Sequence, residues 1–78
     1  MFKLYTYATC PYCEKVRMAF EDMKVPYEEV AAERGTAGSE ELVNLGGKQQ
    51  VPFLVDGEVR MYESDDIIAY ARERFEKN

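Results

Sequence analysis

The stretch FKLYTYATCPYC, residues 2–13, decides how this chain can fold, because a strand-like run ends just before two closely spaced cysteines. Residues 2–7 are rich in aromatic side chains and are followed by Ala8-Thr9, a pattern typical of a β-strand and its end. Pro11 suits the first position of a helix, where its missing N–H costs nothing. The stretch therefore predicts a strand, a short loop and a helix that begins at the cysteines.

Cys10 and Cys13 are the only two cysteines of the chain. With Cys10 at the N-cap, the free N–H groups of Tyr12 and Cys13 point toward its sulfur, and these donors and the helix dipole favour a thiolate over a thiol. Cys13 lies three residues before Val16 on the apolar stripe of the helix, so we expect it to be more buried than Cys10. The pattern indicates dithiol redox chemistry, with Cys10 and Cys13 as the catalytic residues.

Two other interpretations of the cysteines remain open. A zinc site needs about four ligands, whereas this chain has two cysteines and no histidine, so a metal would require a second chain or an added thiol. Because these ligands are too few, we predict no metal ligands in this chain. A purely structural disulfide would close a very short loop, which removes little entropy from the unfolded chain.

The composition is typical of one small domain, which we place at residues 1–78. Hydrophobic residues make up 46% of the chain, so the material for a core exists. The net charge of −5 argues against nucleic acid as a partner, since phosphates would be repelled. No apolar run resembles a signal peptide or is long enough to cross a membrane. These features favour a cytoplasmic monomer.

The middle of the chain predicts a helix, a strand and a second helix. Apolar residues at helical spacing run through residues 11–24, and residues 27–31 form a short strand after Pro26. Residues 33–38 are polar and predict a loop. Ser39 can then cap a short helix that Gly46-Gly47 ends. The side chains expected to face the core from these helices are Tyr12, Val16, Ala19, Phe20, Met23, Leu42 and Leu45.

The last part of the chain predicts a hairpin and a third helix. Strands at residues 51–55 and 58–62 flank Asp56-Gly57, a dipeptide suited to a type I′ turn. Ser64 is a good N-cap for the helix that follows, and the acidic residues after it complement the helix dipole. The inward residues expected here are Ile67, Ile68, Ala71 and Phe75. Together the elements predict an α/β fold, with helices on the faces of a four-stranded mixed sheet.

The order βαβαββα, together with the motifs CPYC at 10–13, Val51-Pro52 and Ser64-Asp65-Asp66, resembles the glutaredoxins over essentially the whole chain. The resemblance implies a thioredoxin-like fold in which Pro52 is cis and its loop faces the active cysteine. It also implies that substrate backbone pairs with Val51 and that Ser64-Asp65 receives the γ-glutamyl end of glutathione. Pro52 as an ordinary trans proline and Ser64 as only a helix cap are the alternatives.

Two positions depart from the glutaredoxin pattern. Many glutaredoxins carry a lysine three positions before the first cysteine, where it meets the glycyl carboxylate of glutathione, but here that position is Tyr7. Tyr62-Glu63-Ser64 replaces a common Gly-Gly pair and resembles the glutamyl-binding Glu-Ser of the N-terminal domain of glutathione transferases. The cations or amides that can replace the missing lysine are Lys48, Gln49, Gln50, Lys15 and Arg17. We also expect Tyr12 to border the glutathione groove.

The resemblance implies a glutathione-dependent thiol–disulfide oxidoreductase that reduces protein disulfides and glutathione mixed disulfides. Glutathione, or a similar low-molecular-weight thiol, would be a co-substrate, and no cofactor would be bound. The glutathione-binding residues expected are Tyr12, Lys48, Gln50, Val51, Pro52, Glu63, Ser64 and Asp65. The alternatives are a small reductant recharged by a flavoprotein reductase and a non-catalytic carrier of a 2Fe-2S cluster held by Cys10 and glutathione.

Overall fold

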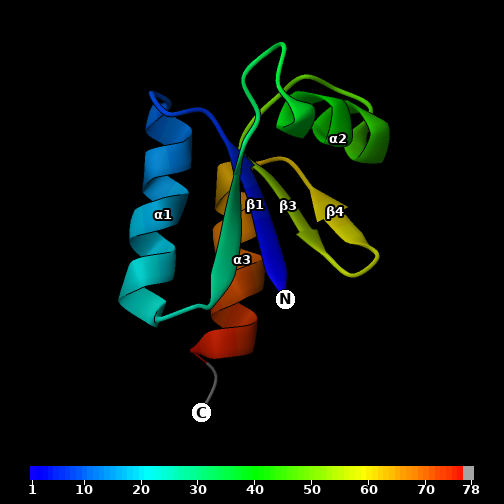
Figure 1. The fold of residues 1–78 in the computed structure, drawn as a ribbon. Coiled ribbons are helices and arrows are strands. Elements are labelled where there is room, and N and C mark those ends of the chain that lie inside the picture. Colours follow the sequence, from blue (N-terminus) through cyan, green and yellow to red (C-terminus); the bar gives the residue numbers. More distant parts are fainter. Residues whose placement is uncertain (77–78) are drawn as a thin grey trace.

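Strands and helices follow one another along the chain in the predicted order (Figure 1). A computed structural model describes residues 1–76, and the last two residues of the predicted domain lie outside the described residues. The elements are β1 (Phe2–Thr6), α1 (Pro11–Met23), β2 (Tyr27–Ala31), α2 (Ala37–Gly46), β3 (Phe53–Asp56), β4 (Val59–Met61) and α3 (Ser64–Phe75).

The strands form one mixed sheet in the order β2-β1-β3-β4. Strand β1 pairs in parallel with β2, which requires the crossover through α1, and it pairs antiparallel with β3 on its other side. Strand β4 returns beside β3 as a hairpin. The predicted fold class, a four-stranded mixed sheet flanked by three helices, is confirmed.

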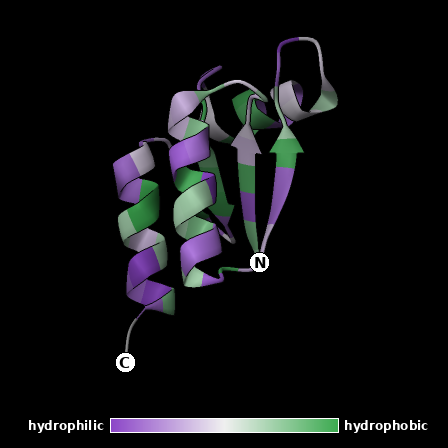
Figure 2. Cartoon of the chain, turned by 90° about the vertical axis from the view of Figure 1, so that its left-hand side faces the viewer, coloured by the Kyte–Doolittle hydropathy of each residue, from purple (hydrophilic) through white to green (hydrophobic). Residues whose placement is uncertain are grey.

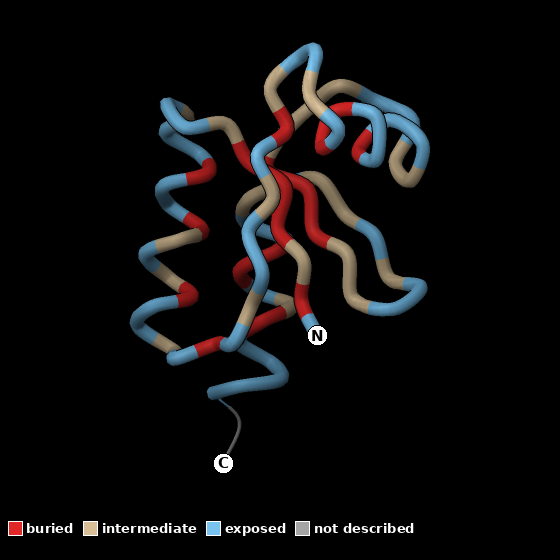
Figure 3. The backbone as a smooth tube through the Cα atoms, in the orientation of Figure 1, coloured by how far each residue is buried: buried red, intermediate tan, exposed pale blue. Residues whose placement is uncertain are grey.

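Side chains on the two faces of the sheet form two apolar clusters. Because side chains alternate along a strand, Phe2 and Leu4 face α1 and α3, whereas Tyr5 faces α2. Figure 2 shows α1 and α3 side by side, and α2 lies across the sheet from α1 in Figure 1. The buried positions concentrate on the central strands and on the inner face of α1 (Figure 3). The larger cluster consists of Phe2, Leu4, Val16, Phe20, Val25, Leu54, Ile67, Ile68 and Ala71.

Helix α2 begins earlier than the sequence predicts. Its N-cap is Thr36, whose hydroxyl oxygen accepts the Ser39 N–H at 3.1 Å, so the prediction of Ser39 as the cap is wrong. The Ser39 hydroxyl instead donates to the side chain of Gln49. A Cβ at Gly38 would lie 1.9 Å from the carbonyl oxygen of Ala31. The first turn of α2 therefore lies directly against the end of β2, which only glycine permits.

Helix α3 also begins one residue earlier than predicted. Glu63 is its N-cap residue and makes no side-chain capping hydrogen bond, while Ser64 is the first helical residue, so the prediction of Ser64 as the cap is wrong. At the other end, Phe75 is 40% exposed and only partly fulfils its predicted inward role, although its ring packs edge-on against Phe2.

The β3–β4 hairpin turns one residue later than predicted. Asp56 still pairs with Val59, so the two loop residues are Gly57 and Glu58. A type I′ turn needs positive φ at both loop residues, but only Gly57 has one, at 62°. The predicted type I′ turn at Asp56-Gly57 is therefore wrong, and glycine at the first loop position fits type II′.

Candidate active site

The two cysteines lie at the start of α1 as predicted. Cys10 is the N-cap residue in extended backbone conformation, and Pro11 occupies the first helical position. The Cys10 sulfur accepts a hydrogen bond from the Cys13 N–H at 3.3 Å. Both thiols are free; Cys10 is half-buried, whereas Cys13 has no exposed surface. The expected difference in burial is confirmed, so a disulfide in solution can meet Cys10 but not Cys13.

Burial also sets the ionisation of the second thiol. It is the largest of the influences that raise the pKa of Cys13 to about 12, and the hydrogen bond with Cys10 acts in the same direction. Reduced Cys13 is therefore a neutral thiol at pH 7. The Cys13 N–H donates to the Cys10 sulfur, while the Cys13 sulfur itself stays protonated.

The loop before β3 lies next to the cysteine helix, and it contains the Val51–Pro52 peptide bond. This bond is cis, as the resemblance implied. Hydrogen bonds hold the loop on the protein side: the Tyr62 hydroxyl accepts the Lys48 N–H at 3.0 Å and donates to the Lys48 carbonyl at 2.9 Å. The peptide that precedes β3 is thus anchored by the residue that follows β4.

Gln49 connects the same loop to three other segments. Its side-chain amide donates to the Tyr7 hydroxyl at 2.8 Å and to the Ala32 carbonyl at 3.0 Å, and its oxygen accepts the Ser39 hydroxyl. Tyr7, which stands where many glutaredoxins carry lysine, therefore holds the loop by a neutral hydrogen bond. Gln49 has no free amide group to offer a ligand, so this candidate replacement for the lysine is excluded.

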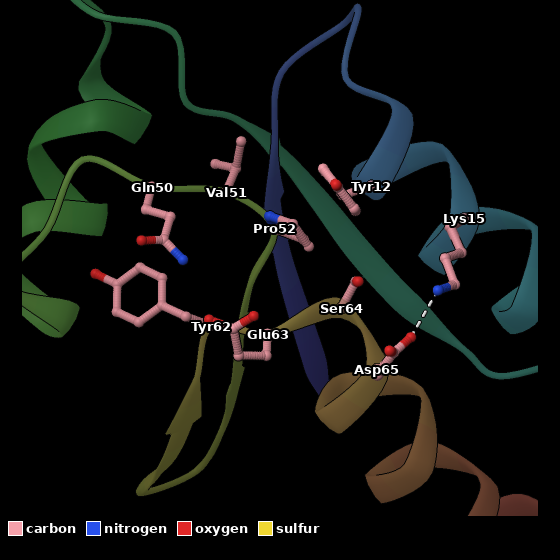
Figure 4. A pocket seen from close by; sticks show the side chains of 9 residues that line it. All are labelled: Tyr12, Lys15, Gln50, Val51, Pro52, Tyr62, Glu63, Ser64 and Asp65. Carbon is pink, nitrogen blue, oxygen red and sulfur yellow. Dashed lines mark hydrogen bonds and ion pairs between the residues drawn. The ribbon is translucent and has the colours of Figure 1, made fainter.

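A cavity of about 410 Å³ lies between the start of α1, the Val51–Pro52 loop and the start of α3 (Figure 4). Across it, the Lys15 ammonium pairs with the Asp65 carboxylate at 2.6 Å. Seven of the eight predicted glutathione-binding residues line it; the full lining is Tyr12, Lys15, Gln50, Val51, Pro52, Tyr62, Glu63, Ser64 and Asp65. Lys15 is the one cation among these nine residues.

Lys48 is the predicted binding residue that does not line the cavity. Its ammonium lies 5.0 Å from the centre of the Tyr62 ring, on which it packs as a cation over an aromatic face. Arg17 also points elsewhere, toward Glu29 and the carbonyl of Tyr7. Of the cations considered for the missing lysine, only Lys15 faces the cavity, because it lies three residues after Tyr12 on the same side of α1.

Sequence reasoning missed Tyr62 as a lining residue. It follows β4 directly, and its position between a strand and a helix marked it only as part of the Glu-Ser motif. The centre of its ring lies 4.6 Å from that of Phe53 in the neighbouring strand β3, so its role depends on a contact between strands. No local pattern in the sequence signals such a contact.

Residues 1–76 contain neither a membrane-spanning helix nor a cluster of metal-ligating side chains. No helix in that range is long and apolar enough to cross a membrane. No group of three or more His, Cys, Asp or Glu side chains in the same range is arranged to hold a metal ion.

The fold and the site define a class: a thioredoxin-like protein with a dithiol at a helix N-terminus and a cis-proline loop that shares a cavity with the first turn of that helix. Similar solved structures agree. A glutathione S-transferase from the Antarctic clam Laternula elliptica matches with a TM-score of 0.82 and 30% identity, over 97% of this chain and 36% of that one. Glutathione S-transferase isozyme E7 from Drosophila melanogaster matches with a TM-score of 0.84 and 28% identity, over 100% of this chain and 36% of that one.

The chain belongs to the family described as the N-terminal domain of glutathione S-transferases, whose model matches residues 4–78. It is 31% identical to glutaredoxin 1 of Rickettsia prowazekii over 72 residues, 90% of this chain and 76% of that protein. It is 41% identical to glutaredoxin 2 of Escherichia coli K12 over 69 residues, 87% of this chain. The match spans about a third of that relative, 31% of its length. The resemblance to glutaredoxins with a transferase-like feature is confirmed.

Proposed function

We propose that this chain is a glutathione-dependent thiol–disulfide oxidoreductase that reduces protein disulfides and glutathione mixed disulfides. The observation that carries the proposal is the unequal pair of thiols at the start of α1. Cys10 is accessible and accepts a backbone N–H, while Cys13 is covered and lies one turn further along. This arrangement separates an attacking thiol from a resolving one.

The chemistry follows from thiol–disulfide exchange. The Cys10 thiolate attacks a sulfur of the substrate disulfide, the substrate S–S bond breaks, and one substrate thiolate leaves and takes up a proton. The mixed disulfide on Cys10 is then resolved by glutathione or by Cys13. In the second case a Cys10–Cys13 disulfide forms, and two glutathione molecules later reduce it and become oxidised glutathione.

The cavity beside the dithiol is the proposed glutathione site. Val51 offers backbone N–H and C=O groups for pairing with the peptide, and the first turn of α3 offers N–H groups for the γ-glutamyl carboxylate. The N-cap Glu63 leaves these donors without a side-chain acceptor of its own. The Asp65 carboxylate would accept hydrogen bonds from the ammonium of the γ-glutamyl group. Lys15, already paired with Asp65, supplies the positive charge that the site lacks at Tyr7.

Serine variants of the two cysteines test the division of labour. Cys10→Ser should abolish all disulfide exchange, because no other thiol is accessible. Cys13→Ser should keep the removal of glutathione from a glutathionylated peptide and lose most reduction of protein disulfides. Both activities are measured with glutathione as the reductant and compared with the unchanged protein.

Two outcomes would count against the proposal. An inactive Cys13→Ser protein beside an active Cys10→Ser protein would reverse the roles of the thiols. Reduction of the internal disulfide by a flavoprotein reductase but not by glutathione would make the chain a thioredoxin-like reductant instead.

A further inference from the structure

Arg17 forms an ionic network behind the dithiol, on the side of α1 away from the proposed glutathione site. Its side chain is only 18% exposed. It donates to the Tyr7 carbonyl at 3.0 Å, to the Glu29 carboxylate at 2.7 Å and to the Glu14 carboxylate at 3.1 Å. Glu29 also accepts the Thr6 hydroxyl at 2.6 Å. One side chain thus joins the cysteine loop, α1 and β2.

The position of this charge relative to Cys13 is informative. Arg17 lies four residues after Cys13, so the two side chains share one face of α1. Cys13 is the residue that must lose its proton before it can attack, yet it is fully buried. A fixed cation that is itself largely shielded from water acts on such a thiol more strongly than an exposed one.

The groups around the Cys13 sulfur act in opposite directions. Burial and then the Cys10 sulfur raise the pKa of Cys13, whereas the Tyr7 backbone and the charge of Arg17 lower it. Burial is the largest single influence on the pKa of Arg17 and lowers it, but the hydrogen bonds and charges of Glu29 and Glu14 together leave this pKa raised, so the cation persists. Glu29 from β2 and Glu14 from α1 offset part of its charge.

We propose that Arg17 is a positioning residue for the resolving step: its guanidinium, fixed by the Tyr7 carbonyl and Glu29, stabilises the developing Cys13 thiolate, so that the internal disulfide closes faster. The inference rests on the proposed function. In this step Cys13 gives its proton to solvent and its thiolate attacks the Cys10 sulfur. The bond between Cys10 and the bound thiol breaks, the Cys10–Cys13 bond forms, and the released thiolate takes up a proton, with no net oxidation.

The test is a single-turnover measurement of internal disulfide closure. Cys10 is loaded with glutathione from oxidised glutathione, samples are quenched with acid, and mass spectrometry follows conversion of the mixed disulfide to the internal disulfide over a range of pH. Arg17→Gln should slow closure about tenfold at neutral pH, equivalent to about one pKa unit at Cys13, and should move the pH profile to higher pH. Arg17→Lys should recover part of this loss, because it keeps the charge without the fork of donors.

Two controls separate this role from a structural one. In a Cys13→Ser background, Arg17→Gln should change removal of the mixed disulfide by added glutathione less than about twofold, since no pKa change at Cys13 enters that step. Arg72→Gln makes the same substitution at an exposed arginine of α3, which pairs with Glu76. This variant should leave the rate of closure unchanged. Equal slowing of both steps by Arg17→Gln, or slowing of neither, would overturn the proposal.

Glu29→Gln is expected to change the rate of closure in the direction opposite to Arg17→Gln. It therefore distinguishes an effect of charge from general damage to the fold. It removes a carboxylate that offsets Arg17, so closure should be as fast as in the unchanged protein or faster. A purely structural network predicts slower closure in this variant as well, which would contradict the proposal.

The measurement is repeated with Cys10 loaded from hydroxyethyl disulfide, which lacks the γ-glutamyl group. If only this reagent loads Cys10, the proposed use of glutathione fails, while the effect of Arg17 on closure is still measured. If both reagents load Cys10 and Arg17→Gln leaves closure unchanged, only the inference about Arg17 fails.

Discussion

At the scale of single residues, the two thiols differ because one helical turn takes them from the rim of the fold to its core. Cys10 precedes the helix and keeps part of its surface, whereas Cys13 lies on the face of α1 that also buries Val16 and Phe20. The same burial that protects Cys13 from outside reagents makes its ionised form costly. This cost should appear in the stability of the reduced protein.

The free energy of unfolding of the reduced protein should fall as the pH rises above about 8.5, where Cys13 ionises in the unfolded chain. The folded protein retains that proton because burial raises the pKa of Cys13 to about 12. Between these values the unfolded state binds fewer protons, so stability decreases by up to about 1.4 kcal/mol per pH unit. Below the lower value this contribution is constant and fully present.

Urea unfolding at a series of pH values checks this expectation, with Cys13→Ala as the matched protein. Burial and a hydrogen bond to Glu41 raise the pKa of Tyr5, so its ionisation in the unfolded chain lowers the stability of both proteins at still higher pH. This contribution is the same in the two proteins and cancels in the comparison. A Cys13→Ala protein with the same pH slope as the unchanged protein would disprove the assignment.

At the scale of elements, the site depends on how closely α2 approaches the hairpin. Gly46 ends α2, and a Cβ there would lie 2.1 Å from the Tyr62 hydroxyl and 2.8 Å from the Phe53 ring. Tyr62 in turn holds both backbone groups of Lys48. The last turn of α2 therefore sets the position of the loop that carries Pro52.

Gly46→Ala should destabilise the protein by roughly 1–3 kcal/mol, the usual cost of overpacking. Helix propensity alone predicts the opposite, a gain of about 0.5–1 kcal/mol, so the sign of the change decides between them. Chemical denaturation of Gly46→Ala, Tyr62→Ala and the double variant forms a cycle. Because Tyr62→Ala removes the nearest obstacle, Gly46→Ala should cost less in that background, and an unchanged cost would refute the contact.

At the scale of the whole molecule, the cavity is assembled from three segments that are distant in sequence. Tyr12 and Lys15 come from α1, Gln50 to Pro52 from the loop before β3, and Tyr62 to Asp65 from the link between β4 and α3 and the first turn of α3. The Lys15–Asp65 pair joins the first of these to the last. Both side chains are more than half exposed, so the pair contributes little to stability and is free to serve a ligand.

Asp65→Ala should therefore weaken the use of glutathionylated substrates and leave the melting temperature nearly unchanged. The loss of one charge-assisted hydrogen bond, about 1.5–3 kcal/mol, corresponds to a rise in KM of roughly tenfold to a hundredfold. A plain disulfide without the γ-glutamyl group should react as before. Steady-state kinetics with the two substrates measure the difference.

The control for this variant is Asp66→Ala, which removes a carboxylate from the same helical turn but not from the cavity lining. It should leave both substrates unaffected. Equal slowing of the two substrates by Asp65→Ala, or the same selective loss in Asp66→Ala, would argue that these carboxylates act only on the helix dipole.

The sequence by itself determined the order of the elements, the fold class and the place of the dithiol, because these depend on local signals. Proline at the first position of α1, alternation along β1 and the Gly46-Gly47 helix end act within a few residues of where they stand. The resemblance to glutaredoxins, through the motifs at residues 10–13, 51–52 and 62–65, led to seven of the nine cavity residues.

Only the tertiary structure decided which polar groups were already occupied. The Ser39 hydroxyl does not cap α2 because it donates to Gln49, and Gln49 is unavailable to a ligand because it serves Tyr7 and Ala32. Lys15 faces the cavity while Arg17 turns toward Glu29. Each polar group has a limited number of hydrogen bonds to make, and partners that are distant in sequence compete for them once the chain has folded.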